Sequence, residues 1–131
     1  FGANCGVGAS DLLRTVLGFS STNTKLPIVA KGNAGIPKYH DGHIHYDGTP
    51  ELMATYAVLA RDCGATIVGG CCGTTPDHLR AMRTALEKYE PHERPSLETI
   101  KTALGEFSSE SDGTDGNAPI RKRQNRRRRI T

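Results

Sequence analysis

One stretch of the sequence decides the fold: residues 65–86, which read ATIVGGCCGTTPDHLRAMRTAL. Ala65 to Val68 is a short apolar run typical of a strand buried on both faces, and two glycines and two adjacent cysteines follow it directly. Thr75 and Pro76 then predict a helix start, because the hydroxyl accepts backbone N–H groups and proline has none to satisfy. One face of that helix is apolar and is expected to lie on the core: Leu79, Met82, Ala85 and Leu86.

The preceding residues repeat this order. Leu26 to Ala30 is a second short apolar run, and Thr49, Pro50 and Glu51 begin a helix that Gly64 ends. The apolar stripe of that helix consists of Leu52, Met53, Tyr56, Leu59, Ala60 and Cys63. Between the two elements lies a long loop from Asn33 to Gly48.

The chain opens with a third unit of the same kind. Phe1 to Cys5 has the pattern of the end of a strand, and a short helix follows that Ser10 is expected to cap and Gly18 to end. Strand, helix, strand, helix, strand, helix is the order of a parallel α/β sheet with right-handed crossovers.

Composition and charge divide the chain into parts. Seven of the 17 basic residues lie between Arg121 and Arg129, so residues 1–120 hold 10 basic and 14 acidic side chains. We expect an α/β body in residues 1–90, a partly helical extension in residues 91–107, and a disordered basic tail in residues 108–131 that is rich in Ser, Gly and Asp before the basic run.

The sequence also indicates the cellular compartment of the protein. No apolar run approaches the roughly 18 residues that a membrane span needs, and no signal-peptide pattern opens the chain. Four cysteines without a secretory signal favour a reducing compartment, where clustered thiols more often hold metal or do chemistry than form disulfides. The expected location is the cytoplasm.

Three cysteines follow predicted strands: Cys5, Cys71 and Cys72. Functional side chains of parallel α/β folds collect where strands end and loops begin. Adjacent residues of a regular strand point to opposite faces, so Cys71 and Cys72 can face one ion only where the backbone leaves the strand. The neighbouring glycines at 69, 70 and 73 permit that turn.

Zinc geometry sets the requirement for such a site. Thiolate sulfurs lie about 2.3 Å from a tetrahedral zinc ion and hence roughly 3.7 Å from one another. The strand from Leu26 would lie between the two cysteine-bearing strands and separate their backbones by about 10 Å, so only a curved sheet brings the sulfurs together. Three protein ligands leave one position open, as in catalytic zinc sites.

Other interpretations of these residues stay open. Cys71 and Cys72 could be inert thiols of a tight turn, and the helix-face position of Cys63 is typical of core packing. In the long loop, His40, His43 and His45 form a weak metal-binding pattern that also suits a solvated active-site flap.

Three motifs resemble the homocysteine S-methyltransferase family: Gly2-Ala3-Asn4-Cys5, Asn33-Ala34-Gly35, and Gly69-Gly70-Cys71-Cys72-Gly73-Thr74-Thr75-Pro76. The resemblance covers about residues 1–90 and implies the C-terminal portion, about three of eight units, of a (β/α)8 TIM barrel that binds homocysteine. It implies Zn²⁺ held by Cys5, Cys71 and Cys72. A chain that starts at Phe1 without Met is then expected to be a fragment, poorly soluble and inactive alone, because two sheet edges would be unpaired.

The resemblance also implies a reaction, the transfer of a methyl group to the homocysteine thiolate to form methionine. The segment from Asn33 to Cys72 looks most like bacterial betaine-homocysteine methyltransferases and the homocysteine module of cobalamin-dependent methionine synthase. Gly32, where the family often has proline, and the basic tail favour betaine as the donor. Methylcobalamin or methyltetrahydrofolate and S-methylmethionine are the alternatives.

Four further residues are candidate substrate contacts. Tyr39 and Tyr46 in the long loop could offer aromatic faces to a quaternary ammonium, or could be ordinary surface tyrosines. Asn4 and Asn33 belong to the matched motifs.

Two functions of other classes compete with methyl transfer. The basic run could bind nucleic acid, but it contains no aromatic residue for base stacking, so a solubilising tail is favoured. A structural zinc module would need a fourth protein ligand. The sequence makes no prediction of the oligomeric state.

Overall fold

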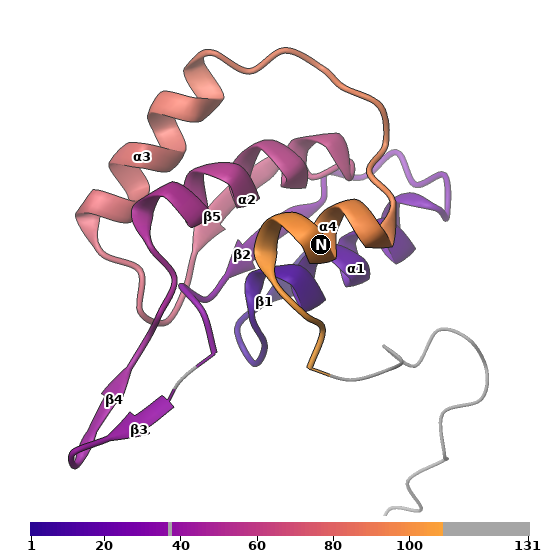
Figure 1. Ribbon diagram of the computed structural model, residues 1–131. Helices are drawn as coiled ribbons and strands as arrows, with labels where there is room; N and C mark the ends of the chain where they lie inside the picture. Colours follow the sequence, from indigo (N-terminus) through magenta and orange to yellow (C-terminus); the bar gives the residue numbers. More distant parts are fainter. Residues whose placement is uncertain (37, 109–131) are drawn as a thin grey trace, which may run out of the picture.

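The computed structural model describes residues 1–36 and 38–108 (Figure 1). The strands and helices along these residues are β1 (Gly2–Asn4), α1 (Ala9–Ser20), β2 (Val29–Gly32), β3 (Lys38–His40), β4 (His43–His45), α2 (Pro50–Asp62), β5 (Ile67–Gly70), α3 (Pro76–Glu87) and α4 (Leu97–Leu104). The predicted α/β order is confirmed. A hairpin, β3 and β4, stands where a loop was expected, and the predicted disordered tail lies outside the described residues except for Ser108.

β1, β2 and β5 form one parallel sheet in the order β1-β2-β5. The register aligns Ala3, Ala30 and Val68 in one row, and this row packs on the hydrophobic core beneath the helices. Ile67, in the adjacent row, is 54% exposed. The expectation of strands buried on both faces is therefore wrong for the described residues, because three strands leave the sheet open where a closed barrel would cover its inner face.

The strands also begin later than the apolar runs do. Leu26 is 65% exposed, and the ladder starts where the Val29 N–H donates to the Phe1 carbonyl. Ala65 is buried, but its N–H donates to the Ala60 carbonyl, so it belongs to the turn that ends α2. The apolar runs therefore do not mark where a strand begins, because backbone hydrogen bonds set that position.

The sequence signals for α2 and α3 are confirmed. The Thr49 hydroxyl oxygen accepts the Leu52 N–H at 3.1 Å, and Gly64 follows the end of α2 with a φ of 107°. Thr75 precedes Pro76 at the start of α3 as expected. On α3, Met82 is buried but Leu79 is 50% exposed and lines a shallow groove beside Val68, so its predicted core position is wrong.

Both predicted ends of α1 are wrong. Gly8, not Ser10, is the N-cap residue, and the Ser10 hydroxyl donates instead to the Glu106 carbonyl at 3.3 Å. The helix continues past Gly18 to Ser20. At this end the Leu17 carbonyl accepts the Ser21 N–H at 3.0 Å and the Ser20 and Ser21 hydroxyls. The Arg94 guanidinium, from a distant segment, also donates to it at 2.6 Å.

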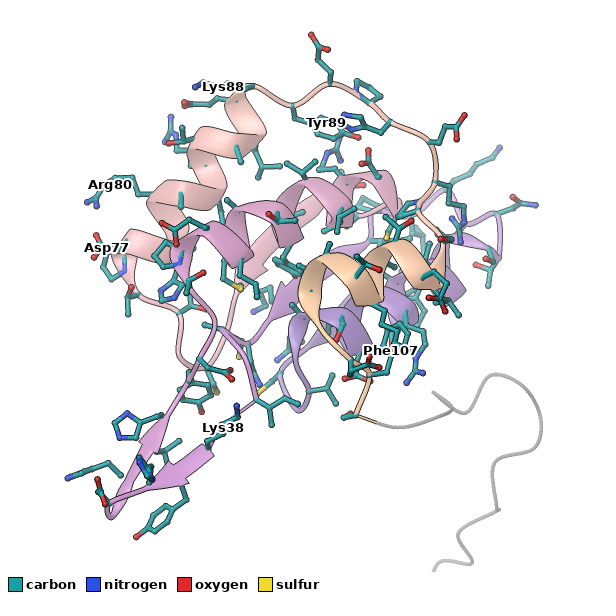
Figure 2. All side chains as sticks on the ribbon, viewed as in Figure 1. Lys38, Asp77, Arg80, Lys88, Tyr89 and Phe107 are labelled. Atoms are coloured by element: carbon teal, nitrogen blue, oxygen red, sulfur yellow. The ribbon has the colours of Figure 1, made fainter. Side chains whose placement is uncertain are left out.

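The C-terminal segment packs across the helices. α4 contacts both α1 and α2, and its residue Ile100 is fully buried. Phe107, labelled in Figure 2, lies 4.4 Å from the Arg14 guanidinium of α1. The Ser108 N–H donates to the Asp11 carboxylate at 3.1 Å, so Ser108 is held in place where the tail was expected to begin.

Among the described residues, none of the helices has the length and apolar character needed to cross a bilayer. Cys63 is fully buried at the end of α2, which confirms its predicted role in core packing.

Candidate metal centre

The structure brings three sulfur atoms together at the carboxyl end of the sheet. The Sγ atoms of Cys5, Cys71 and Cys72 all lie within 4.8 Å of one another, and those of Cys5 and Cys72 are 3.5 Å apart. This spacing is close to the roughly 3.7 Å between thiolates on one tetrahedral zinc ion. No other trio of metal-ligating side chains in residues 1–36 and 38–108 is drawn together in this way. The three thiols could therefore bind a metal ion.

The end of β2 holds both cysteine-bearing segments. On one side, the Cys5 N–H donates to the Lys31 carbonyl at 3.1 Å. On the other, the Cys71 N–H donates to the Gly32 carbonyl, and the Ala34 N–H donates to the Cys72 carbonyl, both at 2.9 Å. The central strand β2 thus hydrogen-bonds both cysteine-bearing segments, one on each side.

Asn33 adds a side-chain contact to this support. It is 3% exposed, and its Oδ1 accepts the Cys72 N–H at 3.1 Å. The amide also hydrogen-bonds the Cys5 thiol and contributes to a lower Cys5 pKa. Asn33 therefore touches both halves of the thiol cluster.

The backbone turns sharply at both cysteine segments. Cys5 has a φ of 59°, an uncommon left-handed conformation for a residue other than glycine, and Gly6 continues with 75°. Gly73 also has a φ of 75°, and a Cβ atom there would meet the Tyr46 ring. Glycine is needed at 73 for both reasons, and the turn directs Cys71 and Cys72 to one side.

The thiols have different proton affinities. The Gly6 N–H lowers the pKa of Cys5 most, and hydrogen bonds from the Cys72 and Cys71 thiols act in the same direction. The pKa of Cys72 is raised, first by its hydrogen bond to Cys5 and then by that to Cys71. Cys5 is therefore the preferred thiolate of the metal-free cluster, with Cys72 holding a proton that a metal ion would displace.

Tyr46 lies over the cluster, whereas Tyr39 does not. Burial raises the pKa of Tyr46, and the charge and hydrogen bond of Cys72 raise it further. Tyr39 is 77% exposed on the hairpin, which projects away from the body in Figure 1. Asn4 is exposed on β1 opposite Lys31. Of the four predicted substrate contacts, Asn33 and Tyr46 lie beside the thiols.

Sequence reasoning missed the contact by which His78 ties the cysteine turn to the long loop. Its Nδ1 accepts the Thr75 N–H at 3.1 Å, and its Nε2 donates to the Gly48 carbonyl at 2.6 Å. The Gly48 N–H in turn donates to the Ala34 carbonyl at 2.8 Å. The signal was the Thr75-x-x-His78 spacing of a capping box, in which Glu or Gln usually occupies the fourth position.

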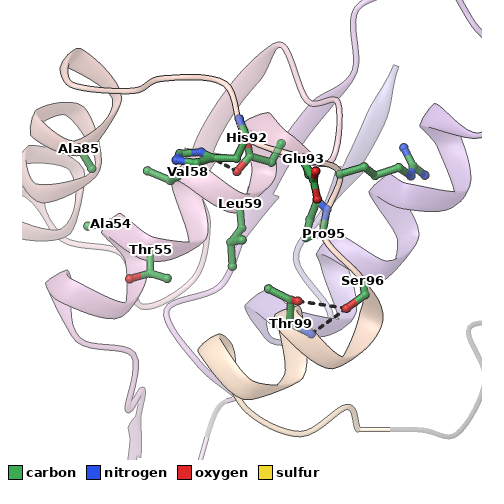
Figure 3. A pocket seen from close by; sticks show the side chains of 12 residues that line it. Ala54, Thr55, Val58, Leu59, Ala85, His92, Glu93, Pro95, Ser96 and Thr99 are labelled. Atoms are coloured by element: carbon green, nitrogen blue, oxygen red, sulfur yellow. Dashed lines mark hydrogen bonds and ion pairs between the residues drawn. The ribbon is translucent and has the colours of Figure 1, made fainter.

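A separate groove lies in the helical layer, away from the sulfurs (Figure 3). α2, the connector before α4, and α4 itself line it, with Leu59, Pro95 and Thr99 among the lining residues. His92 Nδ1 and Asp62 Oδ2 are 3.2 Å apart at its rim. None of the three clustered cysteines lines this groove.

Comparison with known proteins assigns the chain to a family. A sequence model of the homocysteine S-methyltransferase family matches residues 1–86, so the chain belongs to that family. It is similar to a methionine synthase of Mycobacterium tuberculosis, with 32% identity over 109 residues, and to one of Mycobacterium leprae, with 31% identity over 115 residues. Each match covers 79% of this chain, which spans 9% of the length of each relative.

Proposed function

We propose that Cys5, Cys71 and Cys72 hold a Zn²⁺ ion at which homocysteine binds through its sulfur, and that a methyl group is transferred to that sulfur to form methionine. The observation that carries the proposal is the convergence of three thiols within 4.8 Å at the end of the sheet. Membership of the homocysteine S-methyltransferase family supports the choice of substrate.

The donor set fits zinc. Thiolates favour soft or borderline metals, and three of them leave one tetrahedral position for a substrate. Cys72 is the most exposed of the three, so the cluster is open to solvent on its side. Bound zinc would keep a thiol ligand deprotonated near neutral pH and so keep it nucleophilic.

Residues of the chain position the cysteines and limit the access of water to them. The β2 carbonyls and Asn33 fix the positions of the cysteines, and Tyr46 limits access of water to one side of them. In the reaction, a lone pair of the homocysteine sulfur forms the new carbon–sulfur bond. The bond between the methyl group and the donor breaks with its electron pair on the donor, and the thiol proton leaves to solvent.

For the methyl donor we propose betaine, with Tyr46 as the aromatic face for its quaternary ammonium. The contact of Tyr46 with Cys72 supports this choice, whereas the exposure of Tyr39 gives that residue no support. The similarity to proteins named methionine synthase supports methionine as the product. Methylcobalamin or methyltetrahydrofolate is the alternative donor. S-methylmethionine is the third candidate. A donor panel run on this chain joined to units that complete the sheet would separate the three by methionine formation.

A structural zinc site is the competing function. It needs four protein ligands, whereas the cluster in the described residues offers three. Nucleic-acid binding would depend on Arg121 to Arg129, which lie outside the described residues.

X-ray absorption on the zinc-loaded chain tests the proposal. We expect three sulfur neighbours at about 2.3 Å, and a fourth after homocysteine is added. A site that already has four protein ligands and does not change would contradict it.

Substitution gives a second test with a matched control. Cys71→Ser should lose most of the bound zinc, and activity in a completed protein. Cys63→Ser should keep the zinc and lower stability instead, because Cys63 is fully buried and does not belong to the group of three converged thiols. Equal zinc loss in both variants would refute the assignment.

A further inference from the structure

The β3–β4 hairpin presents three histidines on one of its faces. The strands pair Lys38 with His45, Tyr39 with Ile44, and His40 with His43. Cross-strand partners share a face and neighbours along a strand alternate, so the histidines lie on one face and Tyr39 and Ile44 on the other. The His40 and His45 rings are already in contact, with centroids 6.4 Å apart.

The turn between the strands fixes this arrangement. Asp41 and Gly42 connect the strands with φ values of 49° and 80°. Two central residues with positive φ, and an Asp-Gly sequence, define the tight type I′ hairpin turn. The turn keeps His40 directly opposite His43, where Cβ atoms of facing residues are about 4.5–5.5 Å apart.

We propose that His40, His43 and His45 form a second metal site, for a divalent transition cation such as Zn²⁺. Two histidines separated by one residue on a strand, with a third on the adjacent antiparallel strand, supply three imidazole ligands and leave one position open. This ligand set is known for zinc, and imidazole also suits copper and nickel. The site is independent of the thiol cluster and of the proposed methyl transfer.

The surroundings leave the imidazoles available. All three histidines are exposed, and the hairpin projects from the body in Figure 1. Lys38, the remaining residue of that face, is paired with Asp47 at 2.6 Å, so its charge is directed to the base of the hairpin (Figure 2). The ring nitrogens of the three histidines are not as close to one another as the three sulfurs are. Rotation of exposed side chains between staggered conformations can bring them together without backbone movement.

The test uses the full chain, without a polyhistidine tag, and Zn²⁺ alone as the probe. In a variant with Cys5→Ser, Cys71→Ser and Cys72→Ser, isothermal titration should still find one bound Zn²⁺ per chain. Adding His43→Asn should weaken Zn²⁺ binding at least about tenfold. Loss of a residue that only hydrogen-bonds a metal ligand already lowers metal affinity by about that factor, and His43 would be a ligand itself. His92→Asn is the matched control, since its side chain is 61% exposed outside the hairpin, and should change nothing.

A second comparison covers the case in which the triple variant does not fold. The unmodified chain should bind two equivalents of Zn²⁺ and the His43→Asn chain one, with circular dichroism verifying that both are folded. The proposal is overturned if the triple variant is folded and binds no Zn²⁺, or if His43→Asn binds as well as its parent. A dimer that holds one ion per two chains would also overturn it.

Discussion

Removing one buried hydroxyl should weaken the fold and the thiol cluster together. The Tyr56 hydroxyl oxygen accepts the Gly32 N–H at 3.0 Å, and Tyr56 is fully buried. Tyr56→Phe removes that hydrogen bond from the protein interior, and the net loss of one hydrogen bond costs about 0.5–1.5 kcal/mol. Since about 1 kcal/mol shifts the Tm of a 60–100-residue domain by about 4–8 °C, the Tm should fall by about 2–12 °C.

The consequence should reach the cysteines, because the carbonyl of the same Gly32 accepts the Cys71 N–H. Urea denaturation and zinc titration of the two proteins measure both effects, and we expect zinc affinity to fall about tenfold, as for other indirect partners of metal ligands. Tyr39→Phe is the matched control, since it removes the same hydroxyl from a side chain that is 77% exposed. If Tyr56→Phe changed stability by less than about 0.5 kcal/mol, as surface substitutions usually do, the reasoning would be refuted.

Three further predictions concern the cysteines and the turn beside them. Gly73→Ala should destabilise the protein more than Gly6→Ala in thermal denaturation, because both residues have a φ of 75° but only at Gly73 would a Cβ meet a ring, and equal losses would contradict this. Burial raises the pKa of Cys63 from 9.0 to about 12, so the unfolded chain releases this proton first and the free energy of unfolding falls between about pH 9 and 12. The slope is at most about 1.4 kcal/mol per pH unit for one group, and Cys63→Ala should remove it from pH-dependent urea titrations; an unchanged slope would show that the thiol is not the cause. After chelation, mild oxidation should join Cys5 to Cys72, whose sulfurs are 3.5 Å apart, and peptide mass spectrometry should find Cys63 unmodified; a dominant bridge between any other pair would count against the geometry.

The elements that carry strong local chemistry were predictable from the sequence. Thr49 and Thr75 precede proline, and their helices begin there as expected. The glycines around Cys71 and Cys72 predicted that the backbone leaves the strand, and β5 ends at Gly70. Metal binding by the converged sulfurs stays a prediction.

Contacts between distant segments were not predictable. At the end of α1, the Ser20 and Ser21 hydroxyls are local, but the contact of Arg94 with the Leu17 carbonyl spans more than 70 residues and has no local signal. The hairpin was missed because its strands have three residues each, which is too short for their polar and apolar alternation to mark a strand, although Asp41-Gly42 is a typical hairpin turn. The role of Asn33 depends on the backbone of Cys72, 39 residues away.

Four consecutive residues, 31–34, at and just past the end of the central strand make the hydrogen bonds described above to the cysteine segments, Asn33 through its side chain and the other three through the backbone. Natural variation in this short stretch should therefore resemble damage to the cysteines themselves, although none of the four carries a sulfur atom. When inherited or engineered changes are sorted by effect, a change at Asn33 belongs with changes to the cysteines.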